Sequence, residues 1–225
     1  MHRKSVLLTI LLMLTLSGCF VPKVQDYTHF EPKFDLLDYF AGETYAWGQF
    51  QDRSGKVIRR FQVKIQGTVS NQSGGPTLVL DERFLYDDGE RQTRVWTIER
   101  LPKSHPKFEE GLDALYRGTA EDVIGEAIGK VAGNALNWKY VLNMPYKDST
   151  IQLNFNDWMF LQQDGVLMNR ANVTKWGFNV GEVTLFFTKS LPEWAQVPER
   201  AQVPERAQAP VRAQVPAGSD WSDIK

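Results

Sequence analysis

The sequence predicts an all-β fold, an antiparallel β-barrel of about 8 to 9 strands with at most one short helix. Aromatic residues make up 12% of the chain, and they lie in short segments where apolar and polar side chains alternate, as in half-buried strands. Residues typical of turns separate these segments. The longest helical periodicity, over residues 108–115, allows one short helix at most.

Nine segments between residues 36 and 190 carry the pattern of a strand. In chain order they are residues 44–51, 57–66, 77–86, 90–100, 115–122, 136–144, 150–161, 166–176 and 180–189. Turn residues mark four of the connections, at 52–55, 71–76, 87–89 and 163–165. Nine short strands over about 155 residues are typical of an antiparallel barrel or sandwich.

One hairpin can be predicted in register. The sequence Asp-Asp-Gly at residues 87–89 suits a three-residue loop with Gly89 in the left-handed conformation. This loop sets Glu82 opposite Arg94. The same face then pairs Leu80 with Trp96 and Leu78 with Ile98.

The predicted pair of Glu82 and Arg94 lies on an otherwise apolar face. Buried ion pairs seldom add net stability, because desolvation offsets the Coulomb attraction. One interpretation is structural: the pair fixes the register and closes the floor of the barrel. The other is functional: Arg94 anchors an anionic head group and Glu82 orients it.

Large aromatic side chains fall on the same alternating faces. Trp138 and Tyr140 share one face of the segment 136–144. Together with Phe84 and Trp96, they are candidates to line a ligand pocket, although aromatic packing in a core is the alternative.

A second polar group is expected near one end of the barrel. We predict a charged cluster there, formed by Asp157, Arg170, Lys175 and Glu182. We interpret it as a network that stabilises the fold rather than as a catalytic site. A bulge in the strand is expected to turn Asp157 outwards.

Glycines recur at positions 125, 129 and 133. This spacing is found in packed membrane helices, but Glu126 and Lys130 interrupt any apolar span. A strand passing close to another backbone, or a flexible lid at the mouth of the barrel, fits at least as well.

The first 18 residues predict a secretory signal peptide. Arg3 and Lys4 precede an apolar stretch too short to span a bilayer, and small residues lead to Cys19. The arrangement resembles the lipobox of bacterial lipoproteins. That implies a diacylglycerol on Cys19, cleavage before it and acylation of the new amino terminus. The alternative is an ordinary signal whose cysteine is incidental or a buried thiol.

A lipid at Cys19 would attach the protein to a membrane, since three acyl chains exceed what stable anchoring needs. Phe20, rather than Asp, follows the cysteine, which favours the outer membrane, facing the periplasm. Cys19 is also the only cysteine, so the chain can form no internal disulfide.

The carboxyl-terminal end is repetitive. A six-residue unit, first seen at residues 195–200 as Ala-Gln-Val-Pro-Glu-Arg, recurs through about residue 218 with one proline in each copy. Such a segment cannot form a core, and we expect it to be disordered and partly polyproline-like. It is either a slippage expansion or a spacer that contacts an envelope protein. The predicted parts are thus a signal (1–18), a lipidated tether (19–35), a barrel domain (36–190) and a tail (191–225).

Composition argues against several functions. Removal of the signal lowers the formal net charge from -1 to about -3 and leaves no basic block, so nucleic acid is not an expected partner. Only His29 and His105 remain after processing, which argues against a histidine triad or metal site. No nucleophile elbow, phosphate loop or dinucleotide fingerprint is found. We therefore predict no enzymatic activity, no metal and no cofactor.

Several short strings within residues 35–190 resemble those of a known family. They are Tyr39-Phe40-Ala41-Gly42, Asp52-Arg53-Ser54-Gly55, Glu82-Arg83-Phe84-Leu85-Tyr86, Asp88-Gly89-Glu90, Arg94-Val95-Trp96, Asp157-Trp158-Met159, and Asn169-Arg170 through Lys175 and Gly177 to Gly181-Glu182. The family consists of proteobacterial lipoproteins known only as a domain of unknown function. The resemblance implies a periplasm-facing lipoprotein with a lipocalin-like, calycin-type barrel, and it implies no established activity. Trp176 stands where the family has Phe, and Thr44 replaces the Trp of the lipocalin Gly-x-Trp motif.

Two functions of different classes follow. The first is a binding module, a lipid-anchored barrel that holds a fatty acid, phospholipid fragment or other amphiphile in a cavity of several hundred cubic ångströms. The second is a structural or assembly lipoprotein of the envelope, whose barrel is filled by its own side chains and whose outer face or tail contacts a protein.

Overall fold

The computed structural model describes residues 21–72, 75–146 and 149–191. The predicted signal peptide (1–18), the predicted lipidation site Cys19 and all but the first residue of the predicted tail lie outside the described residues. None of the helices in the described part of the chain is long and apolar enough to cross a lipid bilayer.

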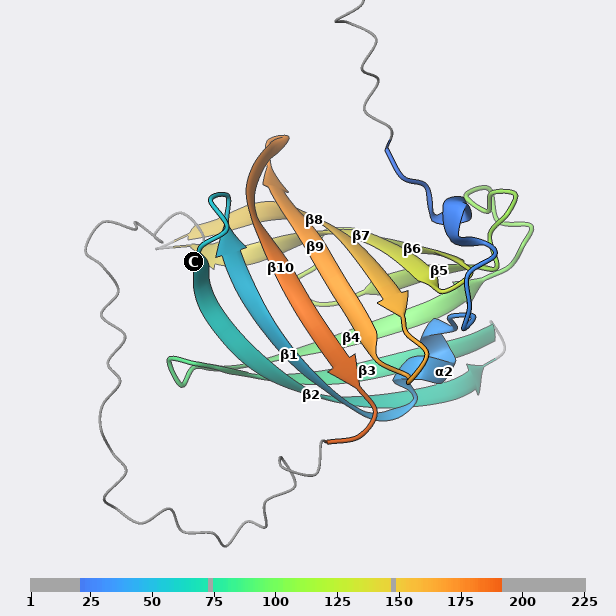
Figure 1. The fold of residues 1–225 in the computed structure, drawn as a ribbon, viewed down its shortest axis with the longest axis horizontal. Coiled ribbons are helices and arrows are strands. Elements are labelled where there is room, and N and C mark those ends of the chain that lie inside the picture. The colour runs from blue at the N-terminus through green and yellow to red at the C-terminus, as the bar shows by residue number, and fades with distance from the viewer. Residues whose placement is uncertain (1–20, 73–74, 147–148, 192–225) are drawn as a thin grey trace, which may run out of the picture.

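Ten strands form a closed, entirely antiparallel barrel (Figure 1). They are β1 (Gly42–Asp52), β2 (Val57–Gln72), β3 (Gly75–Tyr86), β4 (Arg91–Leu101), β5 (Ala114–Thr119), β6 (Ala127–Ala132), β7 (Ala135–Tyr146), β8 (Ser149–Leu161), β9 (Leu167–Lys175) and β10 (Phe178–Thr188). Each strand pairs with its neighbours in sequence, and β1 pairs with β10 to close the barrel. The predicted all-β antiparallel barrel is therefore confirmed.

The strand number exceeds the expected eight or nine, because β6 lies in the glycine-spaced segment. This strand is only six residues long and half of its residues are alanine or glycine, so it carries little of the alternation that marks the other strands.

Residues 108–115, where the sequence allowed one short helix at most, form no helix. Gly111 has a φ of 83°, a left-handed conformation that ends a helix. Among the described residues, the helical elements are a 3-10 turn, η2 (Val24–Tyr27), and one helical turn, α2 (Leu36–Phe40).

The element α2 closes one end of the barrel, here called the plugged end (Figure 1). Asp35 caps it by accepting hydrogen bonds from the backbone N–H groups of Leu37 (3.0 Å) and Asp38 (3.3 Å). Phe40 is buried in the core cluster, and the hydroxyl of Tyr39 donates to the carbonyl of Gly165 across the barrel (3.0 Å). The opposite end carries the β1–β2, β3–β4 and β9–β10 hairpins and is called the hairpin end.

The register predicted for the β3–β4 hairpin is confirmed. Gly89 has a φ of 86°, and Glu82 lies opposite Arg94. The remaining predicted pairs are also present: Leu80 with Trp96 and Leu78 with Ile98. The turn chemistry together with the strand alternation thus predicts the pairing of Glu82 with Arg94 inside the barrel.

Both flanks of the described chain lie at the plugged end. Val24 packs with Ala132 and Ala135, which end β6 and begin β7. After β10, the ammonium of Lys189 donates to the carbonyl of Ala41 (2.8 Å). The chain therefore enters and leaves the barrel beside α2.

Candidate functional site

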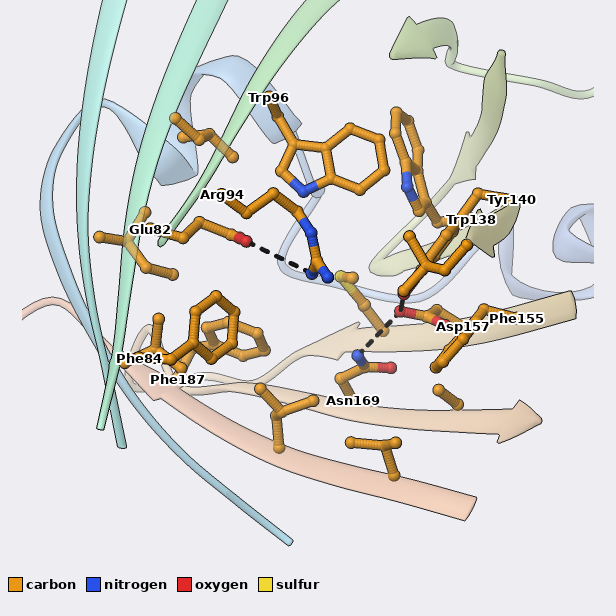
Figure 2. A pocket seen from close by; sticks show the side chains of 18 of the residues that line it. Glu82, Phe84, Arg94, Trp96, Trp138, Tyr140, Phe155, Asp157, Asn169 and Phe187 are labelled. Atoms are coloured by element: carbon orange, nitrogen blue, oxygen red, sulfur yellow. Dashed lines mark hydrogen bonds and ion pairs between the residues drawn. The ribbon is translucent and has the colours of Figure 1, made fainter. Parts of the chain in front are cut away.

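A cavity of about 140 Å³ lies inside the barrel (Figure 2). Most of its wall is apolar, and its lining begins at the plug with Leu36 and Phe40. Toward the hairpin end it reaches Gln92, whose side chain is exposed. The volume is smaller than the several hundred cubic ångströms expected for a lipid carrier.

The cavity brings together all six residues predicted to bind a ligand: Glu82, Phe84, Arg94, Trp96, Trp138 and Tyr140. Their common feature is an inward position in the strand alternation. The ring of Trp96 packs edge-on against Trp138 and Tyr140, with centroid distances of 5.7 Å and 5.5 Å. These three rings form one aromatic wall.

The glycines of β5 and β6 make room for this wall. A Cβ atom at Gly129 or Gly118 would overlap the ring of Trp138. Of the three spaced glycines, only Gly129 lies in a strand, and the group that approaches it so closely is an indole, not the backbone that was expected. At Gly133, by contrast, the close group is the backbone carbonyl of Tyr27.

Arg94 is the central cation of the site. Its Nε and Nη2 atoms donate to Oδ2 of Asp122 (2.9 Å and 2.7 Å), and its Nη1 lies 3.8 Å from Oε2 of Glu82. Burial disfavours the charged guanidinium, but the hydrogen bonds of Asp122 and the charge of Glu82 outweigh it, so the pKa of Arg94 is raised. Two carboxylates thus hold the guanidinium in place.

Asp122 lies in the β5–β6 connection and was not identified in the sequence. Hydrogen bonds between the backbones of Asp122 and Asn143 (2.8 Å) and of Ile124 and Val141 (2.8 Å) hold this loop against β7. A polar residue in a connecting loop carries no periodic signal, so no pattern predicts its partner.

Glu82 has a strongly shifted acidity. Burial raises the pKa of its carboxyl to about 7, although the charge of Arg94 and a hydrogen bond with Trp96 lower it. The charge of Asp122 acts in the same direction as burial. Glu82 therefore exchanges its proton near neutral pH.

Asp157 faces the cavity, not the outside as predicted. The ladder is unbroken here, with Asp157 opposite Trp138 on one side and Ala171 on the other, so no bulge turns it outwards. Its Oδ2 accepts hydrogen bonds from the Tyr140 hydroxyl (3.4 Å) and from Nδ2 of Asn169 (3.2 Å). Burial nevertheless raises the pKa of Asp157 to about 7.

The predicted charged cluster is therefore not one network. Arg170 pairs with Glu182 at 2.5 Å, and the Arg170 side chain is 73% exposed, whereas Asp157 is buried. The ammonium of Lys175 lies 4.5 Å from the centre of the Trp176 ring. Alternation assigns Arg170 to the outside and Asn169, which was missed as a site residue, to the inside.

The site contains two acidic side chains whose pKa values lie near neutral pH. Glu82 and Asp157 line the same cavity and can each hold or release a proton there. Within the described ranges, no group of three His, Cys, Asp or Glu residues could hold a metal ion.

Comparison with known proteins adds little about activity. Among solved structures, an acyl-CoA thioesterase II, TesB2, from Mycobacterium marinum is similar, with 10% identity and a TM-score of 0.20 over 71% of this chain and 84% of that chain. A TM-score this low supports no conclusion. No curated protein matches the chain.

A family model gives the assignment. The model described as a protein of unknown function, DUF3833, matches residues 13–189. This confirms the resemblance to a family whose function is unknown. The chain belongs to the DUF3833 family.

Proposed function

We propose that this protein is a lipid-anchored lipoprotein of the proteobacterial cell envelope, facing the periplasm from the outer membrane, that binds a lipid or other small amphiphile in a lipocalin-like barrel. The observation that carries the proposal is the cavity, in which an aromatic and aliphatic wall surrounds a few fixed polar groups. This combination is typical of small-molecule sites. A core that served stability alone would gain from apolar replacements of Glu82 and Asp157.

The size of the cavity limits the occupant. At about 140 Å³, it compares with engineered cavities of roughly 150 Å³ that admit benzene. A short acyl chain or a single ring fits this space. A longer chain would have to extend past Gln92 at the hairpin end.

Filling the cavity tests the proposal. Ala171 lines the cavity and is 1% exposed, so Ala171→Leu adds volume to the cavity without removing a polar group. Native mass spectrometry of the full chain, purified under mild conditions, is expected to detect a bound amphiphile in the wild type and none in this variant. Asn172→Leu adds apolar volume to the outer face and is expected to retain the ligand.

Absence of any bound species, together with no response of tryptophan fluorescence to added fatty acids, alcohols or amines, would contradict binding. Retention of the ligand by Ala171→Leu would mean that it lies elsewhere.

The anchor is tested separately through Cys19. Cells fed a labelled fatty acid are expected to label the wild-type chain and leave Cys19→Ser unlabelled, because the cysteine sulfur is the acylation site of a lipobox. The wild type is expected in the outer-membrane fraction after density-gradient separation, and the variant outside it. An unlabelled wild-type chain would refute the lipoprotein assignment.

A structural or assembly lipoprotein is the second candidate, and two observations favour it. The cavity is small, and apolar side chains lie in one row on the outer face: Met168 opposite Phe186, and Phe186 opposite Trp47. Met168 and Phe186 are 51% and 42% exposed. Such a patch fits a protein partner, and an empty barrel in the mass-spectrometric experiment would favour this role.

A further inference from the structure

Two buried oxygen atoms, both on residues that line the cavity, accept no hydrogen bond from the described residues. They are Oδ1 of Asp157 and Oδ1 of Asn169, and these residues are only 4% and 3% exposed. Both residues line the cavity, and their other side-chain atoms are joined by a hydrogen bond (Figure 2). Buried polar atoms in native proteins nearly always have a partner, so each such atom calls for an explanation.

The cation of the site is already neutralised. All three guanidinium nitrogens of Arg94 lie beside a carboxyl group. Nε and Nη2 donate to Asp122, and Nη1 lies beside Glu82. With Asp157, the site holds three carboxyls and one guanidinium. An incoming anion would therefore meet an arginine whose charge Asp122 already balances, with two further carboxyls nearby. This disfavours the earlier interpretation of Arg94 as an anchor for an anionic head group.

We propose that the cavity selects an amphiphile whose head donates hydrogen bonds, a primary ammonium or a hydroxyl, and that Asp157 and Asn169 accept those hydrogen bonds. The inference rests on the proposed binding function and specifies its ligand class. The two orphan oxygens, on side chains joined by a hydrogen bond, supply the acceptors, and the aromatic wall of Trp96, Trp138 and Tyr140 receives the apolar body. Oδ2 of Asp157 is already engaged, which leaves Oδ1 for the ligand.

The burial of Asp157 strengthens the preference for an ammonium head. The raised pKa of about 7 for Asp157 means that its carboxylate is unfavourable in the unliganded cavity. An ammonium ion placed against Oδ1 would compensate that charge directly. A hydroxyl would satisfy the same oxygen without changing the charge of the site.

Three six-carbon probes distinguish the possibilities: hexylamine, hexan-1-ol and hexanoate. Their chains are equal in length and short enough for the cavity. Calorimetric titration of the full chain in detergent at pH 8, with a detergent blank, is expected to give hexanoate an affinity at least about tenfold weaker than that of the better of the other two. Tightest binding of hexylamine would assign an ammonium head, and tightest binding of hexan-1-ol a hydroxyl head.

A result in which hexanoate binds best would overturn this inference and leave the proposed binding function standing. A result in which none of the three binds would overturn both.

The acceptor is tested by Asp157→Asn, which keeps the side-chain shape and removes the charge. The affinity of the preferred probe is expected to fall at least about tenfold. Asp81→Asn, on the outer face of β3 where Asp81 pairs with Arg83, is the matched control and is expected to bind normally. Unchanged binding in Asp157→Asn would refute the assignment.

Asn169→Ala provides a second route if Asp157→Asn does not fold. It removes the other orphan acceptor and is expected to weaken the preferred probe several-fold, with hexanoate unaffected. Equal loss for all three probes would indicate a collapsed cavity and contradict selection by the head group.

Discussion

The Asp157→Asn variant is expected to be increasingly stable relative to the wild type as the pH rises from 4 to 8. In the folded protein the pKa of Asp157 is raised from 3.8 to about 7, so the folded state binds more protons than the unfolded state between these values. The contribution of Asp157 to the free energy of unfolding of the wild type is therefore greatest below about pH 4 and is lost as the pH rises through 7. At about 1.4 kcal/mol per pKa unit, the change amounts to roughly 4 kcal/mol.

Several groups contribute to this pH dependence of stability. The pKa of Glu82 is also raised to about 7, so its contribution to the stability of the protein is lost over a similar pH range. Glu82 is present in both the wild type and the variant. The hydrogen bonds of Asn169 and Tyr140 and the charge of Arg94 oppose the shift at Asp157. The difference in unfolding free energy between variant and wild type isolates the one carboxyl, and denaturant titrations at pH 4, 5.5, 7 and 8 measure it.

Asp88→Asn supplies a control of opposite sign. A backbone hydrogen bond from Glu90 and the side chain of Arg59 lower the pKa of Asp88, so its contribution is lost as the pH falls. Its variant is expected to be less stable than the wild type by a nearly constant amount between pH 7 and about pH 5, with the difference shrinking only as the pH falls below about 4. A constant difference between Asp157→Asn and the wild type across the range would contradict the buried ionisable state of Asp157.

Replacement of Gly67 by alanine is expected to displace α2 from the plugged end. A Cβ atom at this position would overlap the backbone carbonyl of Phe40 and lie 3.3 Å from Cδ2 of Leu80. Backbone cannot yield as a flexible side chain can, so the buried Phe40 ring would have to leave its site. We expect a loss of about 3–5 kcal/mol, similar to truncation of a buried phenylalanine.

Thermal unfolding measures this loss, and a decrease in Tm of about 10 °C or more is expected for a domain of this size. Thr68→Ala, at the exposed position next to Gly67 on β2, is the control and is expected to change the Tm little. A Gly67→Ala protein as stable as Thr68→Ala would show that α2 does not depend on the close approach at Gly67.

The sequence was most informative where local chemistry determines geometry. In the β3–β4 hairpin, Gly89 and the two preceding aspartates define the loop, and alternation carries the register to Glu82 and Arg94. The same alternation placed Trp138 and Tyr140 on the cavity wall. It also carried the signal for Asn169, which occupies an inward position between Leu167 and Ala171.

Elements without such periodicity could not be predicted. Asp122 reaches Arg94 from a loop, and its sequence neighbours say nothing about that partner. In β6, Gly129 leaves space for Trp138, and a residue without a side chain adds nothing to the alternation that marks a strand. Asp157 was misassigned because continuous apolar residues follow it, whereas the ladder to β7 and β9 continues through it without a bulge.

Because the chain enters and leaves the barrel beside α2, attachment of either flank to a surface determines which end of the barrel faces the solvent. A fusion partner or an immobilising tag on either flank would sit near the plug, and Gln92 and the hairpins would point away from the support. If an acyl group at Cys19 holds the chain, ligand would reach the hairpin end from the aqueous compartment, and lateral diffusion within the anchoring bilayer would not deliver it directly. Exchange would then depend on the ligand's concentration in water, or on a donor that meets the exposed rim.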